Sequence, residues 1–551
     1  MTPDRHIAVD VLVVGAGPTG LLLTNLLGQM GVKTALVERN ADTVQEPRAV
    51  SIDDESMRAL QAVGLDGAVG RITTRGYGSI YKGPSGRVFA TVKPTSREYG
   101  FEKRNAFQQP ELEAVLRNGL KALDSVSESF GTALAHFEQD DARVLATVTD
   151  ADGRPRTIDA QYMVGCDGGR SQTRKALGIS LEGATFEEPW LIVDLLSTKN
   201  RCFHTEVFCD PARSCITLPG PNGIRRYEFK LKPGETAEDA VEERFVRDLL
   251  ASVGPDAEEP FRRVRVYTFH ARIAERWREG RVFLAGDAAH LTPPFAGQGM
   301  NSGLRDAHNL AWKLAEALSA GTDTSLLDTY EEERRLHAWS MIELALRMGQ
   351  VMMPTSPLQG ALVRAGFHSL SLFPPAKAYF AQMRYKPKPR FETGCIWPDG
   401  RAPKHTLVGR LICQPDVETV SGDHLRLDDA LPDRPVVLVF DEAPDLAVTR
   451  AQCDSFRALG ADVFGITPQG TKPVNAHFPI LRDRSGLLSE GPYPRYLGHA
   501  FLLRRDRYIA MAQPVSRLAK LEPALAQICP KGAPSERGEA GDKAQIAAIN
   551  D

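Results

Sequence analysis

The chain has 551 residues, of which 42% are hydrophobic and 25% charged, with 67 basic against 70 acidic side chains. This length exceeds the size at which a single hydrophobic core stops growing, so two or three domains are expected. The near-balance of charge favours neither nucleic acid nor an anionic membrane as a partner. No apolar run approaches the roughly 20 residues that span a bilayer, and the N-terminus lacks a signal-peptide pattern, so a cytoplasmic location is expected.

The first pattern along the chain is a complete βαβ unit. An apolar strand at residues 9–14 leads into a glycine turn and an apolar helix, and a second strand ends at Glu38. In the turn, Gly15 permits a tight bend, Gly17 lets a pyrophosphate approach the backbone, and Gly20 lets helix and strand pack closely. Glu38 is expected to bind the adenosine ribose. The motif predicts a dinucleotide and by itself leaves FAD and NAD open.

Two later motifs favour a flavin. In the first, Asp167 and Gly168 follow a short strand; in the second, a strand delivers Asp287, and a loop leads to a glycine-rich helix start at residues 297–301. A carboxylate at a strand end suits a sugar-like chain of hydroxyl groups. A helix N-terminus suits the N1–C2=O edge of a reduced flavin, because that edge acquires negative charge.

Strand-rich segments interrupt these α/β stretches. Short β-rich runs between Pro/Gly turns predict a sheet inserted into the first domain. Long helical patterns return at residues 300–349, and a proline-rich stretch at 386–400 marks a boundary. The expected units are an FAD-binding domain (1–75, 103–187 and 268–390), a substrate-binding sheet domain (76–102 and 188–267), a C-terminal α/β domain (391–530) and a disordered tail (531–551).

The eight cysteines are scattered, and none forms a C-x-x-C pair or lies beside a histidine at zinc-ligand spacing. Such cysteines, in a chain without an export pattern, are mostly small buried apolar residues. Neither a disulfide nor a metal site is expected. The C-terminal domain lacks the cysteine pair that thiol exchange needs, which favours a structural or assembly role.

Taken in order and spacing, the three motifs resemble those of the class A flavoprotein monooxygenases, which share the 4-hydroxybenzoate hydroxylase fold, over about residues 8–350. The resemblance implies an α/β fold with a Rossmann-like FAD-binding domain, an inserted β-sheet substrate domain and a C-terminal thioredoxin-like domain. It also implies the residues that bind FAD: Gly15, Gly17, Gly20, Glu38, Arg39, Arg48, Gln109, Asp167, Asp287, Pro293, Gly297, Gly299, Met300 and Asn301.

The resemblance further implies an activity, the hydroxylation of a phenol. NADH or NADPH would reduce FAD, and the reduced flavin would capture O₂ as a C4a-hydroperoxide that hydroxylates the ring ortho to its hydroxyl. Longer stretches, such as residues 47–65 (PRAVSIDDESMRALQAVGL), resemble the family members that hydroxylate 3-(3-hydroxyphenyl)propionate to its 2,3-dihydroxy product in aromatic catabolism. The alternatives are another phenol, resorcinol or a polyketide as substrate, or an epoxidase or oxidase on the same fold. A homodimer is expected.

Residues that act on the substrate are expected on the inserted sheet and beside the flavin ring. The candidates are His204, Arg226, Tyr227 and Pro293 for catalysis, and Arg213 and Arg225 for a substrate carboxylate. Within the resemblance, Arg226 corresponds to an arginine that approaches the flavin. For the others on the sheet, a surface charge, sheet packing or an exposed loop is the preferred interpretation, and for His290 a structural hydrogen bond. A phenol with a pKa of about 10 needs a base or an acceptor, and the sequence does not identify it.

Overall fold

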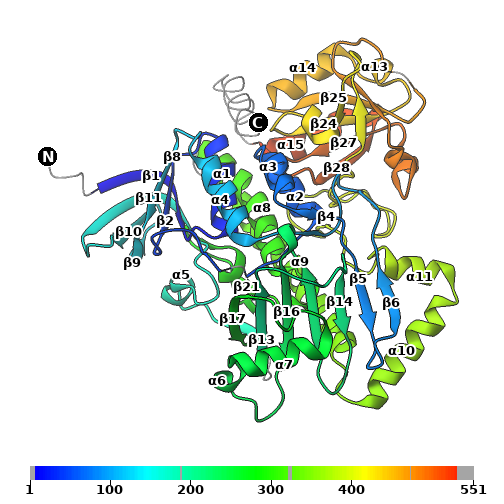
Figure 1. The fold of residues 1–551 in the computed structure, drawn as a ribbon. Helices are drawn as coiled ribbons and strands as arrows, with labels where there is room; N and C mark the ends of the chain where they lie inside the picture. The colour runs from blue at the N-terminus through cyan, green and yellow to red at the C-terminus, as the bar shows by residue number, and fades with distance from the viewer. Residues whose placement is uncertain (1–5, 47, 186–188, 321–324, 472, 530–551) are drawn as a thin grey trace.

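The computed structural model of the chain describes residues 6–46, 48–185, 189–320, 325–471 and 473–529. It has a mixed α/β fold built on three large sheets (Figure 1). The tail at 531–551, expected to be disordered, lies outside the described residues. Among the described helices, none combines the length and the apolar character needed to cross a bilayer.

The first sheet carries the N-terminal βαβ unit. Its path runs β19–β20–β11–β1–β2–β8, and β10 and β9 continue from β11 as antiparallel strands. β1 pairs in parallel with β2 and β11, and its apolar run is buried because both faces of the strand are covered. The strands are β1 (His6–Val14), β2 (Thr34–Glu38), β8 (Val126–Phe130), β9 (Ala133–Gln139), β10 (Val144–Thr149), β11 (Pro155–Gly165), β19 (Arg278–Glu279) and β20 (Val282–Leu284).

Helices pack against this sheet and against one another. α1 (Pro18–Gln29) starts at the glycine turn and contacts α4 (Gln109–Leu120) and α8 (Gly299–Ala320), as Figure 1 shows. Apolar side chains of α1 and α8, such as Leu23 and Leu310, belong to one buried cluster. α9 (Ser325–Met352) follows α8 and packs against it. The helical patterns in the sequence therefore correspond to helices that bury an apolar stripe.

The second sheet joins two segments that are far apart in the chain. Its order is β17–β13–β16–β15–β14–β5–β6, and β5 pairs in parallel with β14 (Figure 1). α7 (Glu243–Val253) covers one face, with Tyr227 and Phe229 in the apolar cluster beneath it. The strands are β5 (Ser79–Lys82), β6 (Val88–Val92), β13 (Trp190–Leu195), β14 (Thr205–Phe208), β15 (Cys215–Pro219), β16 (Arg225–Lys230) and β17 (Phe261–Tyr267).

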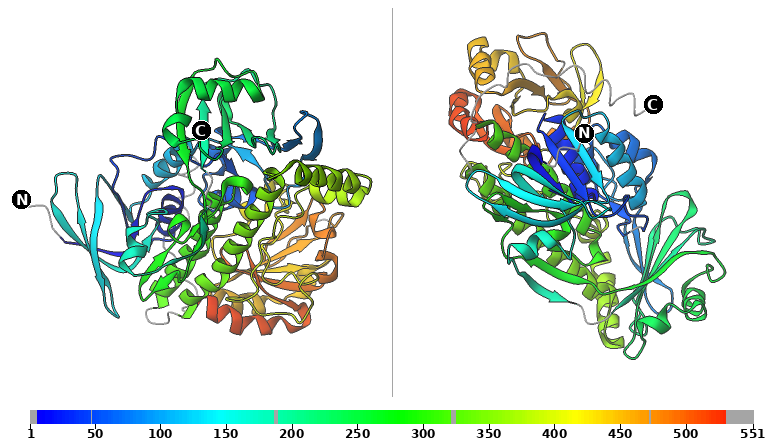
Figure 2. Two further views of the ribbon diagram at one scale, coloured as in Figure 1. Left: turned by 90° about the horizontal axis from the view of Figure 1, so that it is seen from below. Right: turned by 90° about the vertical axis from the view of Figure 1, so that its left-hand side faces the viewer.

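The third sheet forms the C-terminal unit. Its order is β23–β22–β26–β25–β24–β27–β28, with β24, β25 and β26 parallel and β27 and β28 antiparallel. The left view of Figure 2 shows this unit, orange to red, beside the green helices. Its elements are β22 (Asp416–Glu418), β23 (His424–Arg426), β24 (Val436–Phe440), β25 (Asp462–Thr467), β26 (Ile480–Asp483), β27 (His499–Leu503), β28 (Ile509–Pro514), α12 (Leu427–Ala430), α13 (Pro444–Ala447), α14 (Arg450–Ala458) and α15 (Glu522–Ile528).

Smaller elements connect the three sheets. Two three-stranded sheets have the orders β3–β7–β4 and β12–β18–β21. The remaining elements are β3 (Ser51–Ile52), β4 (Thr74–Arg75), β7 (Asn105–Ala106), β12 (Leu181–Thr185), β18 (His270–Ala274), β21 (His290–Leu291), α2 (Asp54–Ala62), α3 (Asp66–Arg71), α5 (Gln172–Ala176), α6 (Ala237–Ala240), α10 (Pro357–Ser371) and α11 (Pro374–Ala381).

A buried network of charges joins the C-terminal unit to α8 and α9. Glu333 on α9 accepts hydrogen bonds from Arg504 (Nη1, 2.7 Å; Nη2, 2.9 Å) and from Lys313 Nζ on α8 (2.8 Å). Arg504 also pairs with Asp506, and all four side chains are almost completely shielded from solvent. Burial alone would raise the pKa of Glu333, but the cations of Arg504 and Lys313 lower it to about 2.

The substitution Glu333→Gln is expected to reduce the free energy of unfolding by about 3 kcal/mol or more, because it removes the buried negative charge that Lys313 and Arg504 share. The ionised carboxylate stabilises the fold above its ordinary pKa of 4.5, and this contribution is lost as the pH falls from 4.5 towards 2. The difference between wild type and variant in chemical denaturation should therefore shrink over that range. The exposed neighbour Glu332 supplies the control, Glu332→Gln. Equal stability of both variants would contradict the prediction.

Candidate active site

One continuous cavity extends from the glycine turn of the first sheet to one face of the second sheet. Its walls come from β1, β2, α1, the start of α8, the C-terminal end of α9 and the loop after α11. The sequence-predicted residues that line it are Gly15, Gly17, Glu38, Arg39, Arg48, Gln109, Asp167, Arg226, Asp287, Gly297, Gly299 and Met300. Most of the predicted cofactor residues thus meet around one space.

The glycine turn forms one end of the cavity. Gly15 has a φ of +106°, and a Cβ at Gly20 would lie 2.0 Å from the carbonyl oxygen of Gly15, so only glycine permits this approach. Around Gly17, by contrast, a Cβ would meet nothing within 4 Å. α1 starts here without a side-chain cap, which leaves backbone N–H groups facing the cavity. An open turn at an uncapped helix N-terminus fits a diphosphate.

Carboxylates border the cavity beside this turn. Glu38 accepts hydrogen bonds from the backbone N–H groups of Ala16 (2.8 Å) and Asn40 (2.9 Å), so its side chain is held at the end of β2. Asp167 accepts from Thr173 N (2.9 Å), and Asp287 opens into the cavity from the turn after β20. The surrounding protein raises the pKa of Asp287 by removing water from its carboxyl group. These oxygens can accept hydrogen bonds from a chain of hydroxyl groups.

The turn that carries Asp287 is fixed from behind by buried charges. Asp306 on α8 accepts hydrogen bonds from Gly286 N (3.0 Å) and pairs with His290 Nε2 (2.7 Å) and Arg334 Nε (2.9 Å). Burial would raise the pKa of Asp306, but His290 and Arg334 lower it. His290 is completely buried, in agreement with a structural hydrogen bond. The position of Asp287 therefore depends on α8 and α9.

The start of α8 lies beside the cavity. Gly297 adopts a left-handed conformation (φ 62°), and the helix begins two residues later. Asn301 does not line the cavity: its side chain donates to Gly297 O (2.6 Å) and accepts from Asp53 N (3.0 Å), which holds the turn. Pro293 is also outside the lining, which includes the next residue, Pro294, in its place.

The second sheet presents two rows of side chains to the cavity. The strand register places Arg226, Leu218, Thr205 and Ser79 in one row, and Glu228, Ile216, Val207 and Tyr81 in the next. Arg226 donates to Asp194 (Nε–Oδ1, 2.6 Å) and to the backbone oxygen of Arg48 (2.7 Å). Burial raises the pKa of Glu228 to about 7, although Arg226 lies 3.9 Å away. A buried carboxyl group thus lies on the cavity face.

Four of the predicted substrate-side residues lie elsewhere. Tyr227 faces α7, because side chains alternate along a strand, and its hydroxyl donates to Asp256 (2.8 Å). Arg225, on the same face, donates to Thr217 Oγ1 (3.0 Å). Arg213 pairs with Glu235 in a partly buried contact, and His204 accepts from Gly78 N (2.9 Å). None of these four is among the lining residues of the described cavity.

Other polar residues of the cavity were absent from the sequence-based candidates. They include Arg104, Glu113, Glu228, Tyr385 and Lys386. The alternation of β16 places Glu228 on the same face as Arg226, which gives a pattern that could have identified it. Lys386 begins the proline-rich stretch that the sequence marks only as a boundary, and Tyr385 directly precedes it. Their position depends on tertiary packing.

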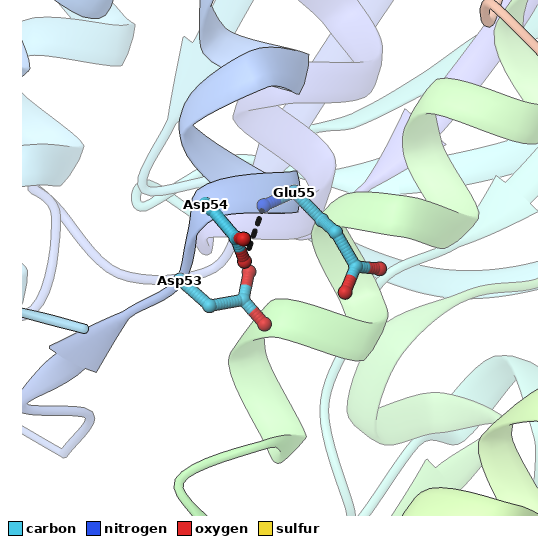
Figure 3. A group of neighbouring side chains, drawn as sticks. All are labelled: Asp53, Asp54 and Glu55. Atoms are coloured by element: carbon cyan, nitrogen blue, oxygen red, sulfur yellow. Dashed lines mark hydrogen bonds between the residues drawn. The ribbon is translucent and has the colours of Figure 1, made fainter. Parts of the chain in front are cut away.

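A buried acidic group lies behind the start of α8. Figure 3 shows Asp53, Asp54 and Glu55 together at the start of α2, with a hydrogen bond from the Glu55 N–H to Asp54. Lys386 Nζ contacts Asp53 (2.9 Å) and Glu55 (2.6 Å), and Arg305 Nε lies 2.7 Å from Glu55. Burial raises the pKa of Asp54 to about 6. The two cations therefore bind this group to α8 and to the cavity wall.

The sequence matches a known family, and solved structures share the fold. The family described as FAD binding domain matches residues 8–345, and the one described as HcaD C-terminal domain matches residues 409–528. The chain therefore belongs to the class A flavoprotein monooxygenases and is an FAD-dependent aromatic hydroxylase. This confirms the predicted class, its cofactor FAD and the mixed α/β fold of the FAD-binding monooxygenases.

Named relatives cover most of the chain. A protein of Klebsiella pneumoniae subsp. pneumoniae, named 3-(3-hydroxy-phenyl)propionate/3-hydroxycinnamic acid hydroxylase, is 40% identical over 474 residues, 85% of each chain. A protein of the same name from Escherichia coli O139:H28 is 38% identical over 532 residues, 96% of each chain. Among solved structures, a ternary complex of aklavinone-11 hydroxylase with FAD and aklavinone has a TM-score of 0.76 at 26% identity, covering 96% of this chain and 100% of that chain.

Substitutions at Gly20 and Gly17 are expected to have different effects, the first on the stability of the fold and the second on the binding of FAD. Gly20→Ala is expected to destabilise the protein by about 1–3 kcal/mol or more, because its Cβ would collide with the Gly15 backbone. Gly17→Ala should change the stability of the FAD-free protein by less than about 0.5 kcal/mol. It should weaken FAD binding at least about tenfold, because its methyl group would enter the open space where the glycine motif predicts the diphosphate. Thermal unfolding and titration with FAD measure the two effects. Unchanged FAD affinity in Gly17→Ala would contradict this assignment.

Proposed function

We propose that this chain hydroxylates a phenol that carries a short carboxylate side chain, with 3-(3-hydroxyphenyl)propionate as the first candidate, ortho to the ring hydroxyl. NADH or NADPH would be the reductant and O₂ the oxidant. The observation that carries the proposal is the single cavity that joins the glycine turn to the polar face of the second sheet. The names of the relatives at 38% and 40% identity support this substrate.

In this proposal FAD binds along the cavity from the glycine turn towards the second sheet. Gly15 and Gly17 would receive the diphosphate, Glu38 the adenosine ribose, and Asp287 the ribityl chain. The residues at 297–299 and the start of α8 would face the ring. Bound FAD would supply the transfer of two electrons and the activation of O₂. The apolar side chains of Phe295, on the loop before α8, and Met348 on α9 would exclude water from the reacting ring.

We assign the acceptance of the phenol proton to Glu228. Its carboxyl group is on the cavity face, and the neighbouring cation of Arg226 is already engaged by Asp194. A carboxyl group with a pKa of about 7 is half ionised near neutral pH and can accept a proton from the substrate hydroxyl. A more electron-rich ring, in turn, reacts faster with an electrophilic oxygen. Tyr227, Arg213 and Arg225 have no part in this assignment because they lie outside the cavity lining.

The C-terminal unit, in our proposal, has a thioredoxin-like arrangement with a structural role. Its central parallel strands β24, β25 and β26, flanked by antiparallel β27 and β28, support this assignment. The eight cysteines of the chain are all free, and none forms a C-x-x-C pair. The buried contacts of Arg504 with Glu333 support a role in holding α9.

The first experiment follows NADH and NADPH consumption by the FAD-loaded enzyme in air, with and without 3-(3-hydroxyphenyl)propionate. The expected result is faster oxidation of the reductant together with an equal amount of 2,3-dihydroxyphenylpropionate, identified by chromatography. Stimulation with H₂O₂ and no catechol would reject this compound as the substrate. A lack of hydroxylation across a panel of phenols, resorcinol and aromatic polyketides would reject phenol hydroxylation itself.

The pH dependence tests Glu228. In wild type, kcat/KM should rise with pH and level off above the pKa of about 7, because the ionised carboxylate is the active form. Glu228→Gln should lower kcat/KM about 100-fold and abolish this dependence. The exposed Glu238 gives the matched control, Glu238→Gln, whose profile should equal that of wild type. A profile in Glu228→Gln that keeps the wild-type inflection would reject the assignment.

Stability gives an independent measurement on the same variant. The pKa of Glu228 rises from 4.5 to about 7 on folding, so its protonated form favours the folded state below 4.5, and this contribution is lost as the pH rises to 7. Glu228→Gln should therefore raise the melting temperature relative to wild type more at pH 8 than at pH 4.5. An equal shift at both values would show that the carboxyl group is not held neutral by burial.

A further inference from the structure

Arg104 lies at the end of the cavity away from the glycine turn. It directly precedes β7, is half-buried and lines the cavity. Its Nη1 donates to Ser79 Oγ and its Nη2 to the Tyr77 hydroxyl (3.2 Å), while the guanidinium lies 4.3 Å from the centre of the Tyr77 ring. These contacts fix the plane of the guanidinium and still leave N–H groups on both terminal nitrogens.

The partners of Arg104 carry no charge. Among the described residues, no carboxylate lies within ion-pair distance of it. Two other cations that line the cavity are matched: Arg226 pairs with Asp194, and Lys386 with Asp53 and Glu55. Burial raises the pKa of the nearby Tyr385 to about 12, so this side chain stays neutral and does not compensate the guanidinium. The cavity therefore contains a fixed positive charge without a counter-ion at this end.

The strand register gives the span between β5, whose Ser79 contacts Arg104, and β16, which carries Glu228. Ser79, which Arg104 contacts, ends the row that starts at Arg226, and Tyr81 ends the row that starts at Glu228. β16 and β5 are separated by β15 and β14, and three spacings of about 4.8 Å make about 14 Å between their backbones. The side chains on the two strands fill part of this span. The remaining space can hold a single aromatic ring with a short acid chain.

We propose that Arg104 is the specificity-determining residue that binds the carboxylate of the substrate and thereby directs the phenol end of the ring towards Glu228. This inference rests on the proposed function and adds the residue that selects acids over neutral phenols. A planar guanidinium binds a carboxylate through two parallel hydrogen bonds. A neutral phenol of the same size would leave the cation without a partner, so the cavity discriminates against it.

The test uses the FAD-loaded enzyme and two variants, Arg104→Met and Arg104→Lys, with Arg97→Met as control. Arg97 lies on the same segment, is exposed, and pairs with Glu102 away from the lining residues. Binding of 3-phenylpropionate, which has the carboxylate and lacks the hydroxyl, is measured from the change in flavin absorbance. The Kd should rise about 30- to 100-fold in Arg104→Met, less in Arg104→Lys, and remain unchanged in Arg97→Met.

Measuring turnover of an acidic and a neutral phenol by Arg104→Met distinguishes a loss of specificity from a general loss of structure. With 3-(3-hydroxyphenyl)propionate, Arg104→Met should raise KM about 30- to 100-fold with a smaller change in kcat, whereas the neutral 3-propylphenol should be hydroxylated at least as well as by wild type. An equal loss on both compounds, or an unchanged Kd for 3-phenylpropionate, would overturn the proposal. If wild type hydroxylates neither phenol, the proposed function fails, while the binding of 3-phenylpropionate still decides the role of Arg104.

Discussion

The parallel pairing of β5 with β14 is the contact on which the substrate end of the site depends. It connects Ser79 with Thr205 and Ile80 with Glu206, residues that belong to distant parts of the chain. Because side chains alternate along each strand, this one register decides which residues form the two rows of the cavity floor. A shift by one residue would turn Ser79 and Tyr81 away and remove the surface on which Arg104 rests. The proposed substrate end of the site is thus a consequence of a long-range strand pairing, whereas the proposed cofactor end follows from the local glycine turn.

The surrounding charges explain why two buried glutamates, Glu228 on β16 and Glu333 on α9, have pKa values shifted in opposite directions. Arg226 lowers the pKa of Glu228, but it donates to Asp194 at 2.6 Å and lies 3.9 Å from Glu228. Desolvation therefore outweighs the attraction, and Glu228 keeps a raised pKa. At Glu333 the balance is opposite, because Arg504 and Lys313 both bind its oxygens directly. The same residue type is thus a candidate proton acceptor in one place and a permanent anion in the other.

The sequence predicts the parts of this architecture that local patterns determine. The glycine turn, β1, α1 and β2 follow from a short stretch of chain, and α8 and α9 from an apolar period that needs no partner to be recognised. Side chains alternate along β16. Once Arg226 is assigned to the cavity face, this alternation places Glu228 on the same face and Tyr227 on the opposite face. No such pattern leads to Arg104 or Tyr385. Each reaches the cavity through packing between segments that are separate in the chain, which a single sequence does not specify.

α9 relates the C-terminal unit to the chemistry at the cavity. Glu333, near its start, binds Arg504 of the C-terminal unit, and Met348, fifteen residues later, lines the cavity. At 1.5 Å per residue, these points are about 22 Å apart on one rigid element. Between them, Arg334 binds Asp306, which holds the turn of Asp287. A single helix therefore carries the contacts of the C-terminal unit, the support of a proposed cofactor ligand and an apolar wall of the cavity. The structural role proposed for the C-terminal unit therefore requires no redox chemistry, because its Arg504 contacts the helix that also lines the cavity.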